Sequence, residues 1–441
     1  MFTKTKFLHS LLKNKVKEIL PKHIEEFKNV KAKYGDKIIQ EVKVNQVLGG
    51  MRGIQGLFYE TSKLDPQNGI LLRNKNLFEL VKSLKYKGSE EPLPEALLWF
   101  LFTGEIPTEK EIESVIDEIH RRNNEINFTE VEKFIDSLPK TMHPMTQLSI
   151  SVLFLQKYSI FAKQYRGGLN KTKYWEPYFE DSLNLISVLP RVAARIYGNI
   201  FNEGNHFKYD PSRNYSENFA HMMGFKTDEV INYLSHYLVL HSDHEGGNVS
   251  AHASFLVSSA LSDPYLSYSS GLNGLAGPLH GLANQEVLRW LLDCYEVLGK
   301  NPTDEALAKY TQDILAAGKV IPGYGHAVLR EVDPRYTIQV QFGDRYLPNN
   351  NLFKLVKQCF KVIPPILQKT GKVQNPWPNV DCSSGVILYH YGIKEFDFYT
   401  VIFGVSRALG VLPTLTWARG FGLPIERPGS ITLDYIKDKF K

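Results

Sequence analysis

Apolar residues recur at spacings of three and four along most of this 441-residue chain, whereas the alternating pattern of strands is scarce. Such spacing places side chains on one face of a helix. The apolar stripe is clearest in residues 282–298, where it consists of Val287, Leu288, Leu291, Leu292, Tyr295 and Leu298. Gly299 follows this stripe, and the next segment runs from Thr303 to Gly318, which are typical residues at helix ends. The sequence predicts an all-α protein with about fifteen or more helices.

Residues 37–60 (KIIQEVKVNQVLGGMRGIQGLFYE) depart from the helical pattern, because β-branched residues stand among glycine turns. They predict one small β element. The chain has no repeat of fixed period and no low-complexity tract, which excludes a solenoid. A single hydrophobic core usually stops growing below this chain length, so two domains are expected.

The formal charge of +5 comes from one terminal segment. Residues 1–34 hold nine lysines and three glutamates, so we expect a solvated helix face rather than a nucleic-acid-binding patch. The first 17 residues contain five lysines and no acid, as organelle transit peptides do, but they lack arginine. No apolar run approaches the roughly 18 residues of a membrane span. The three cysteines form no CxxC pair, which indicates free thiols in a reducing compartment.

Three histidines stand close together in HSDHEGGNVSAH, at positions 241, 244 and 252. A metal site needs neutral imidazoles that converge with a carboxylate, and His241 and His244 could share a helix face. However, the order HxxHE is not the HExxH of zinc proteases, and no cysteine pair completes a ligand set. The alternative is a set of polar histidines at helix ends, satisfied by hydrogen bonds, which fits His241 and His252 better than His244.

Three further residues could carry chemistry, and each has a structural alternative. His280 precedes the predicted helix of residues 282–298, where it either stays neutral and donates to a carbonyl or caps the helix. Arg407 is the only charged residue between Asp397 and Arg419, so it pairs with an internal carboxylate or with a ligand carboxylate. Asp381 follows the proline-stiffened NPWPNV and is either a base of raised proton affinity or a turn former.

The segment GYGHAVLREVDPRY, residues 323–336, crowds charged residues behind a flexible entry. Gly323 and Gly325 allow the backbone to approach a ligand closely, His326 follows, and Arg335 comes after an Asp-Pro turn signal. This pattern indicates half of a binding site for a small anion. Alternatively, the arginines neutralise the acids of the same segment on a solvated face.

Together, HSDHEGGNVSAH, GLAGPLHGLANQE, PGYGHAVLREVDPRY, NPWPNVDCSSG and FGVSRALGVL resemble the citrate synthase family in its eukaryotic mitochondrial form. The likeness runs from the GGMRGIQGLFYETS segment to Arg427. It implies an all-α, citrate-synthase-like two-domain helical fold and a homodimer. Residues 1–281 and 392–441 would form the large domain, and residues 282–391 a small domain that closes over the active-site cleft.

The resemblance also assigns roles to individual residues. It implies condensation of acetyl-CoA with oxaloacetate and water to citrate and CoA, through an enol or enolate, without a metal and without a cofactor, since acetyl-CoA is a substrate. The implied catalytic residues are His280, His326 and Asp381. Those implied for oxaloacetate or citrate are His244, Arg335, Arg407 and, across the dimer interface, Arg427. Those implied for CoA are Arg52, Lys171, Val320, Ile321, Gly323, Tyr324, Gly325 and Asn379.

The sequence departs from the family pattern at three places. Lys171 stands where an arginine is usual, Gln374 stands where a lysine is usual, and DCSSG replaces DAHSG. Two alternatives remain open on this scaffold: a 2-methylcitrate synthase, which takes propionyl-CoA, and an additional filament-forming structural role. The family implies the mitochondrial matrix as the location.

Overall fold

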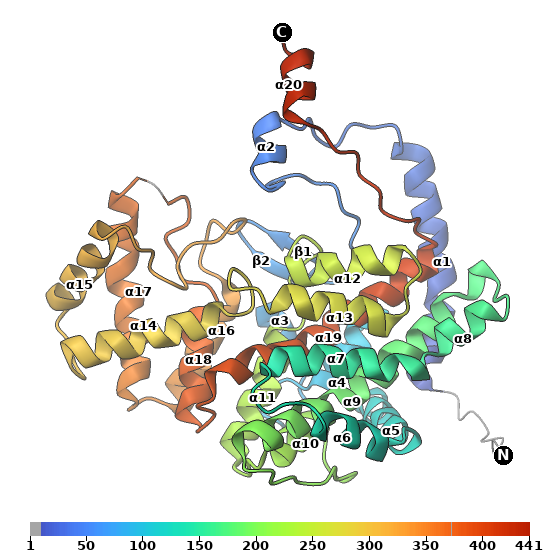
Figure 1. Ribbon diagram of the computed structural model, residues 1–441, viewed down its shortest axis with the longest axis horizontal. Helices are drawn as coiled ribbons and strands as arrows, with labels where there is room; N and C mark the ends of the chain where they lie inside the picture. Colours follow the sequence, from blue (N-terminus) through green and yellow to red (C-terminus); the bar gives the residue numbers. More distant parts are fainter. Residues whose placement is uncertain (1–9, 372) are drawn as a thin grey trace.

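The computed structural model describes residues 10–371 and 373–441, which form twenty α-helices, two short 3₁₀ helices and three short strands (Figure 1). The α-helices are α1 (Leu11–Tyr34), α2 (Val44–Leu48), α3 (Leu77–Ser83), α4 (Pro94–Thr103), α5 (Glu109–Glu125), α6 (Phe128–Asp136), α7 (Pro144–Leu155), α8 (Ile160–Arg166), α9 (Trp175–Phe201), α10 (Tyr215–Met223), α11 (Asp228–Leu240), α12 (Val249–Ser259), α13 (Pro264–Leu275), α14 (Ala283–Leu298), α15 (Asp304–Ala316), α16 (Pro334–Tyr346), α17 (Asn351–Lys369), α18 (Asp381–His390), α19 (Phe396–Phe421) and α20 (Leu433–Lys439). The 3₁₀ helices are η1 (Gln156–Tyr158) and η2 (Lys171–Lys173). The predicted all-α class is confirmed.

The start of α15 and the C-terminal ends of α14 and α15 lie at the residues that the capping pattern predicts. The side chain of Thr303 accepts a hydrogen bond from the Ala306 N–H and so caps the start of α15. Gly299 and Gly318, which follow α14 and α15, have φ of 80° and 74°, values that favour glycine because it has no Cβ. The two helices are consecutive and contact each other.

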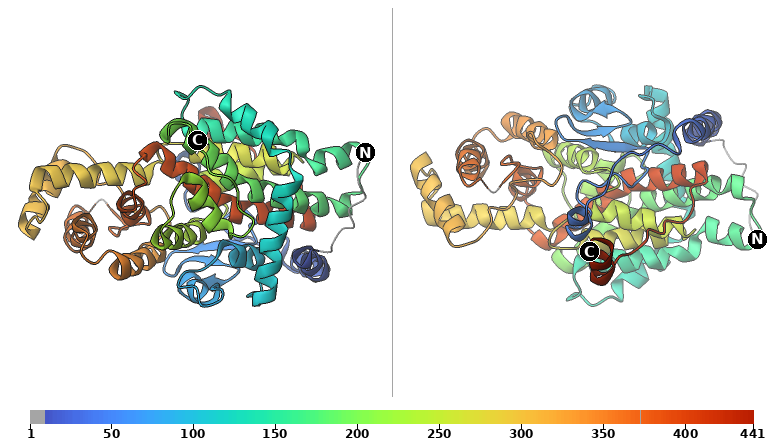
Figure 2. Two further views of the ribbon diagram at one scale, coloured as in Figure 1. Left: turned by 90° about the horizontal axis from the view of Figure 1, so that it is seen from below. Right: turned by 90° about the horizontal axis from the view of Figure 1, so that it is seen from above.

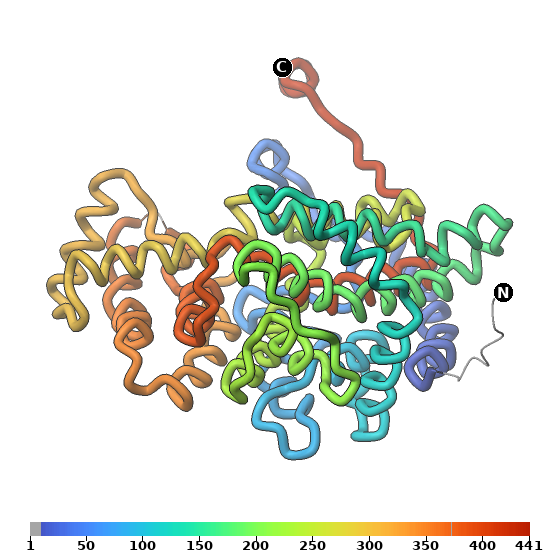
Figure 3. Tube along the Cα trace, turned by 60° about the horizontal axis from the view of Figure 1, so that its bottom comes forward, coloured from blue at the N-terminus to red at the C-terminus, as the bar shows by residue number. Residues whose placement is uncertain are grey.

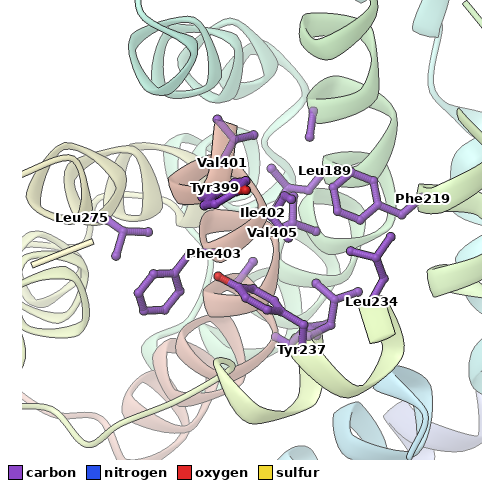
Figure 4. Packing of buried hydrophobic residues seen from close by; sticks show 14 of the residues in the cluster. Leu189, Phe219, Leu234, Tyr237, Leu275, Tyr399, Val401, Ile402, Phe403 and Val405 are labelled. Carbon is purple, nitrogen blue, oxygen red and sulfur yellow. The ribbon is translucent and has the colours of Figure 1, made fainter. Parts of the chain in front are cut away.

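Helices α9 and α19 form the centre of the core. They pack along each other, and α19 also contacts α4, α7, α11, α12 and α13. Figure 4 shows Val401 and Val405 of α19 among apolar side chains such as Leu189 of α9 and Leu234 of α11. Among the described residues, α19 is the one helix long and apolar enough to cross a membrane, and its most apolar 18-residue window is fully buried inside the protein. A helix that is apolar on every face is typical of such a core position.

The predicted small β element is present, and it begins directly after residues 37–60 rather than within them. Strands β1 (Ser62–Asp65), β2 (Gly69–Leu72) and β3 (Lys75–Asn76) form an antiparallel sheet in the order β1-β2-β3, with Ser62 opposite Leu72. The side chains of Ile70 and Leu72 are buried in a second apolar cluster with α3 and α4. Ile38 and Ile39, by contrast, are about four-fifths exposed, so the earlier β-branched residues have no surface to pair with.

Helices α14 to α18 pack mainly on one another. They lie together on one side of the molecule in Figure 1, and the tube in Figure 3 shows the same group. Their contacts with the other helices include those of α14 with α19, of α16 with α3, and of α18 with Tyr233 of α11. The predicted domain boundaries at residues 282 and 391 adjoin the first residue of α14 and the last residue of α18. The division into two domains stays a prediction.

Two segments stand away from the body: the stretch around α2 and the C-terminal arm, residues 424–441, which ends in α20 (Figure 1). Seen from above, in the right panel of Figure 2, the two lie near each other. Both carry exposed apolar side chains, including Leu48, Leu433 and Phe440. At the N-terminus, residues 11–17 form the first turns of α1, and the rest of the leader predicted for residues 1–17 lies outside the described residues except for Ser10.

Candidate active site

Two loops, residues 320–326 and 375–382, are joined by hydrogen bonds. The Gly325 N–H donates to the Trp377 carbonyl (3.1 Å), and the Asn379 N–H donates to the Gly323 carbonyl (2.9 Å). The same Gly323 carbonyl accepts from the Cys382 thiol (2.9 Å). These bonds hold the loop predicted to bind CoA against Asn379 and Cys382, which lie on either side of Asp381.

The other residues predicted for CoA within these loops differ in exposure. Ile321 is buried, whereas the Val320 side chain is 81% exposed. Tyr324 forms a β-bridge with Pro378, and the Asn379 side chain donates to the Gly325 carbonyl (3.4 Å). The loops therefore bring together the backbone groups that the sequence predicted for CoA.

The hydrogen bonds of His326 fix where its ring carries a proton. Its Nδ1 accepts from the backbone N–H groups of Val328 and Leu329, both at 3.0 Å. Burial and the nearby Arg335 guanidinium lower the pKa of His326 to about 4, so the ring is neutral at pH 7. Because Nδ1 accepts, the single proton of the neutral ring lies on Nε2, which remains free to donate.

His280 is held in the same way with the two nitrogens exchanged. Its Nε2 accepts from the Ser250 backbone N–H (3.4 Å) and contacts the Ser250 Oγ (3.0 Å), which leaves the proton on Nδ1. Burial, followed by the charges of Arg407 and Arg335, lowers the pKa of His280 to about 3. The interpretation of His280 as a helix cap is wrong, because Leu282 occupies the N-cap position of α14 and the His280 ring bonds to α12 instead.

Asp381 is the first residue of α18 and is partly buried. The Asn379 side chain accepts from its backbone N–H (3.0 Å), so loop 375–382 fixes its backbone. Burial raises the pKa of Asp381 to about 6, although the positive charges of Arg335 and Arg407 act in the opposite direction. A carboxylate with a raised pKa is suited to act as a base.

The two buried arginines have different partners. Arg407 donates from Nη1 to the Asn248 Oδ1 (2.9 Å) and the Ser250 Oγ (3.2 Å), and from Nε to the His241 carbonyl (3.1 Å). Within the described part of the chain no carboxylate lies within 4.0 Å of Arg407, so the interpretation as an internal ion pair is wrong. A buried guanidinium held by neutral acceptors keeps its charge available for an anion.

Arg335 forms an internal pair that the sequence left open. Its guanidinium donates to both carboxylate oxygens of Asp333, with the Nη2–Oδ2 distance at 2.7 Å, and both side chains are buried. The pair therefore does not lie on a solvated face. Arg330 is exposed and donates to the carbonyl groups of residues 327–329 instead. A forked guanidinium clamped by one carboxylate presents its remaining N–H groups in a fixed direction.

His244 lies beside His326, with ring centroids 5.4 Å apart. It is 8% exposed, and its Nε2 has no hydrogen-bond partner among the described residues. Burial and the Arg335 charge hold its pKa well below the usual range. Because a buried polar atom without a partner is costly, the His244 Nε2 is placed for a ligand atom.

The three histidines of HSDHEGGNVSAH do not converge. α11 ends at Leu240, so His241 and His244 do not share a helix face, and the His241 Nδ1 lies 3.0 Å from the Tyr237 carbonyl. His252, on α12, pairs with Glu426 (3.4 Å). No group of three or more His, Cys, Asp or Glu side chains close enough to hold a metal ion occurs in residues 10–371 and 373–441.

Three predicted binding residues lie on exposed segments away from this cluster. Arg52 follows α2, Lys171 begins η2, and Arg427 lies on the C-terminal arm. η2 follows α8, which lies at the opposite end of the molecule from α15 and α17 in Figure 1. The neighbouring Glu426 is held on α12 by a hydrogen bond from its N–H to the Ser259 Oγ (3.0 Å). One chain alone does not bring these three charges to the cluster.

The sequence interpretation missed Asn248 and Ser250, which connect Arg407 to His280. Asn248 caps α12 through a hydrogen bond from the Ala251 N–H, and its Oδ1 also lies 2.8 Å from the Ser250 Oγ. Both residues stand inside the segment HSDHEGGNVSAH. An Asn directly before a helical run is a recognisable N-cap signal, but its bond to Arg407 depends on a residue 159 positions away.

An all-helical fold that gathers two neutral imidazoles, a carboxylate of raised pKa and two buried guanidinium groups defines an enzyme acting on small anionic substrates. The family model of the citrate synthase C-terminal domain matches residues 50–429. The mitochondrial citrate synthases of Daucus carota and Saccharomyces cerevisiae are 49% and 50% identical over 431 residues, which is 98% of this chain and 91% and 90% of theirs. The chain belongs to the citrate synthase family, whose members are acyltransferases.

Solved structures show the same fold. The crystal structure of citrate synthase from Pyrobaculum aerophilum has a TM-score of 0.77 at 23% identity, covering 90% of this chain and 97% of that chain. Citrate synthase from Thermoplasma acidophilum, in a ternary complex with carboxymethyl coenzyme A and oxaloacetate, has a TM-score of 0.73 at 20% identity, covering 89% and 97%.

Proposed function

We propose that this protein condenses acetyl-CoA with oxaloacetate and water to give citrate and CoA. The observation that carries the proposal is the proton arrangement of the site. Two partly buried imidazoles are neutral and each keeps one free N–H, while Asp381 has a raised pKa and lies in the field of two arginines. Enolisation of a thioester needs this combination, a base for a weakly acidic C–H and neutral donors for the oxygen that becomes negative.

Asp381 would remove a proton from the acetyl methyl group, and the Nδ1–H of His280 would donate to the thioester oxygen as negative charge develops there. A neutral imidazole suits this role because its N–H is held in place by the bonds of Nε2 to Ser250. The resulting enol or enolate carbon is the nucleophile of the condensation.

His326 would donate from Nε2 to the ketone oxygen of oxaloacetate as the carbon–carbon bond forms. Arg335, Arg407 and His244 would bind the substrate carboxylates and hold the ketone beside the enolate carbon. Water then hydrolyses the citryl thioester, breaking the C–S bond and releasing citrate and CoA with a free thiol. The proposed steps use side chains of the protein only, so no cofactor is included.

We propose that residues 282–391 form a small domain that closes over the bound substrates, because an enolate must be kept from bulk water. CoA would lie along the loop from Val320 to Gly325. The exposed positions of Arg52, Lys171 and Arg427 support a homodimer in which a second subunit completes the site, with Arg427 reaching the oxaloacetate of its partner. The ternary complex of the Thermoplasma relative with carboxymethyl coenzyme A and oxaloacetate supports the binding of oxaloacetate and a CoA thioester.

The names of the curated relatives support a mitochondrial location, and we propose the matrix. The activity is tested by release of the CoA thiol from acetyl-CoA, with and without oxaloacetate. We expect release that depends on oxaloacetate and that Asp381→Asn nearly abolishes, because an amide cannot accept the proton. Full activity of Asp381→Asn would refute the proposal, and faster turnover of propionyl-CoA than acetyl-CoA would favour a 2-methylcitrate synthase.

A further inference from the structure

The hydroxyl group of Tyr237, on α11, is buried without a partner. Its side chain is fully buried, and the oxygen has no hydrogen-bond partner among the described residues. The matching residue one turn earlier, Tyr233, is buried to the same degree but donates to the Ser384 carbonyl (3.0 Å). An unpaired buried hydroxyl lowers the stability of a protein, so its retention indicates a role other than stabilising the fold.

The Tyr237 ring is held in one orientation. The His241 ring stacks on it, with centroids 3.8 Å apart and an interplanar angle of 15°, and the His241 Nδ1 lies 3.0 Å from the Tyr237 carbonyl. Figure 4 shows the hydroxyl directed toward Phe403. The Phe403 ring lies 4.8 Å from the Arg407 guanidinium carbon and 6.3 Å from the His280 ring. The hydroxyl therefore faces the candidate active site.

Among the charged side chains, Asp381 has the largest effect on the pKa of this hydroxyl. Tyr233 of α11 contacts Ser384 of α18. Asp381 lies about one turn before Ser384 on α18, and Tyr237 lies about one turn after Tyr233 on α11. Burial raises the pKa of the Tyr237 hydroxyl, and the largest contribution from a charge is that of Asp381. The charges that face Asp381 itself are Arg335 and Asp333, at the start of α16, and Arg407 of α19.

The Asp381 carboxylate accepts no hydrogen bond from the described residues, although its backbone is fixed by Asn379. A base that removes a proton from carbon must be held in one orientation, because small displacements cost much of the rate. We propose that Tyr237 is a positioning residue for Asp381: its O–H donates to the carboxylate when α18 shifts against α11 over bound substrates. This inference rests on the proposed role of Asp381 as the base.

The test is Tyr237→Phe, which removes only the hydroxyl, in the full-length protein with acetyl-CoA and oxaloacetate. We expect kcat to fall by about tenfold to a hundredfold, the range for a hydrogen bond to a charged group. The KM for oxaloacetate should stay within about twofold, because the hydroxyl does not bind that substrate. The acid limb of kcat/KM for acetyl-CoA should move to higher pH, because a donor to the carboxylate lowers its pKa. The melting temperature should not fall, because an unpaired hydroxyl is removed.

Tyr233→Phe is the matched control, since it removes a paired hydroxyl from the same helix. It should lower the melting temperature and leave the acid limb where it is. The inference is overturned if Tyr237→Phe has the kcat and acid limb of the wild type, or if only its KM for oxaloacetate rises, which would place the hydroxyl on the substrate. Asp381→Asn in the same assay separates the two proposals. If it is inactive while Tyr237→Phe is normal, only the role of Tyr237 fails.

Discussion

Gly323 is the position at which one added methyl group should affect both stability and activity. Its φ is 79°, a conformation that residues with a Cβ adopt at a cost of about 1–2 kcal/mol. A Cβ there would lie 2.5 Å from the Cys382 Sγ and 2.7 Å from the Val287 Cγ2. Relieving such overlap in a packed interior costs about 1–3 kcal/mol. Gly323→Ala should therefore lower the free energy of unfolding by about 2–5 kcal/mol.

The same substitution should slow the reaction, because the Gly323 carbonyl accepts hydrogen bonds from Asn379 and Cys382, on either side of Asp381. A displacement of the base by about 1 Å costs about a hundredfold in rate. The measurements are urea denaturation followed by circular dichroism, and thiol release from acetyl-CoA in the presence of oxaloacetate. Assays at a temperature at which the variant remains folded separate slower catalysis from loss of folded protein.

Gly318→Ala is the matched control, because Gly318 has a φ of 74° but no heavy atom within 4 Å of an added Cβ. It should cost only the backbone strain of about 1–2 kcal/mol and leave kcat unchanged. Adding Cys382→Ala to Gly323→Ala removes the nearer overlap and should restore part of the lost stability. Equal destabilisation by Gly318→Ala and Gly323→Ala, or no effect of Cys382→Ala on the latter, would refute the packing argument.

Four further predictions concern charge. The kcat/KM for acetyl-CoA should fall as the pH drops through about 6, where the Asp381 carboxylate gains a proton. His280 and His326 stay neutral down to a pH of about 4. A pH–rate profile whose acid limb lies below pH 4 would contradict this assignment. Because the folded-state pKa of Asp381 is raised, its contribution to the free energy of unfolding is present at low pH and is lost as the pH rises through 6. Asp381→Asn should therefore be more stable than the wild type in urea denaturation at pH 8. A less stable variant would count against burial as the cause of the raised pKa. Arg407→Lys should lower kcat/KM for oxaloacetate by about a hundredfold with an unchanged circular dichroism spectrum, because an ammonium cannot make the forked contacts, and a loss below threefold would exclude a carboxylate-binding role. His252→Ala should loosen the C-terminal arm, measured as faster proteolytic cleavage of the arm with the rest intact, and unchanged cleavage would mean that the other contacts of the arm suffice.

The position of the sheet and the partners of Arg407 show where sequence patterns stop being sufficient. Residues 37–60 have the composition of a strand, but a strand needs a buried face, and the surface that provides one lies under residues 62–76. Arg407 was correctly singled out as a buried charge. Its acceptors, however, are an amide, a hydroxyl and a carbonyl from a segment more than 150 positions away, and no local pattern distinguishes them from a carboxylate partner.

Local sequence signals account for the helices, because caps such as Thr303 and apolar spacing act over a few residues. The sequence also supplied the inventory of the site, through motifs long enough to identify the family. Tertiary structure decided which ring nitrogen of His280 and His326 carries the proton, why Asp381 has a raised pKa, and that the Tyr237 hydroxyl is left unpaired. Desolvation and hydrogen bonding depend on neighbours that lie close in space but far apart in the chain, and no local pattern encodes them.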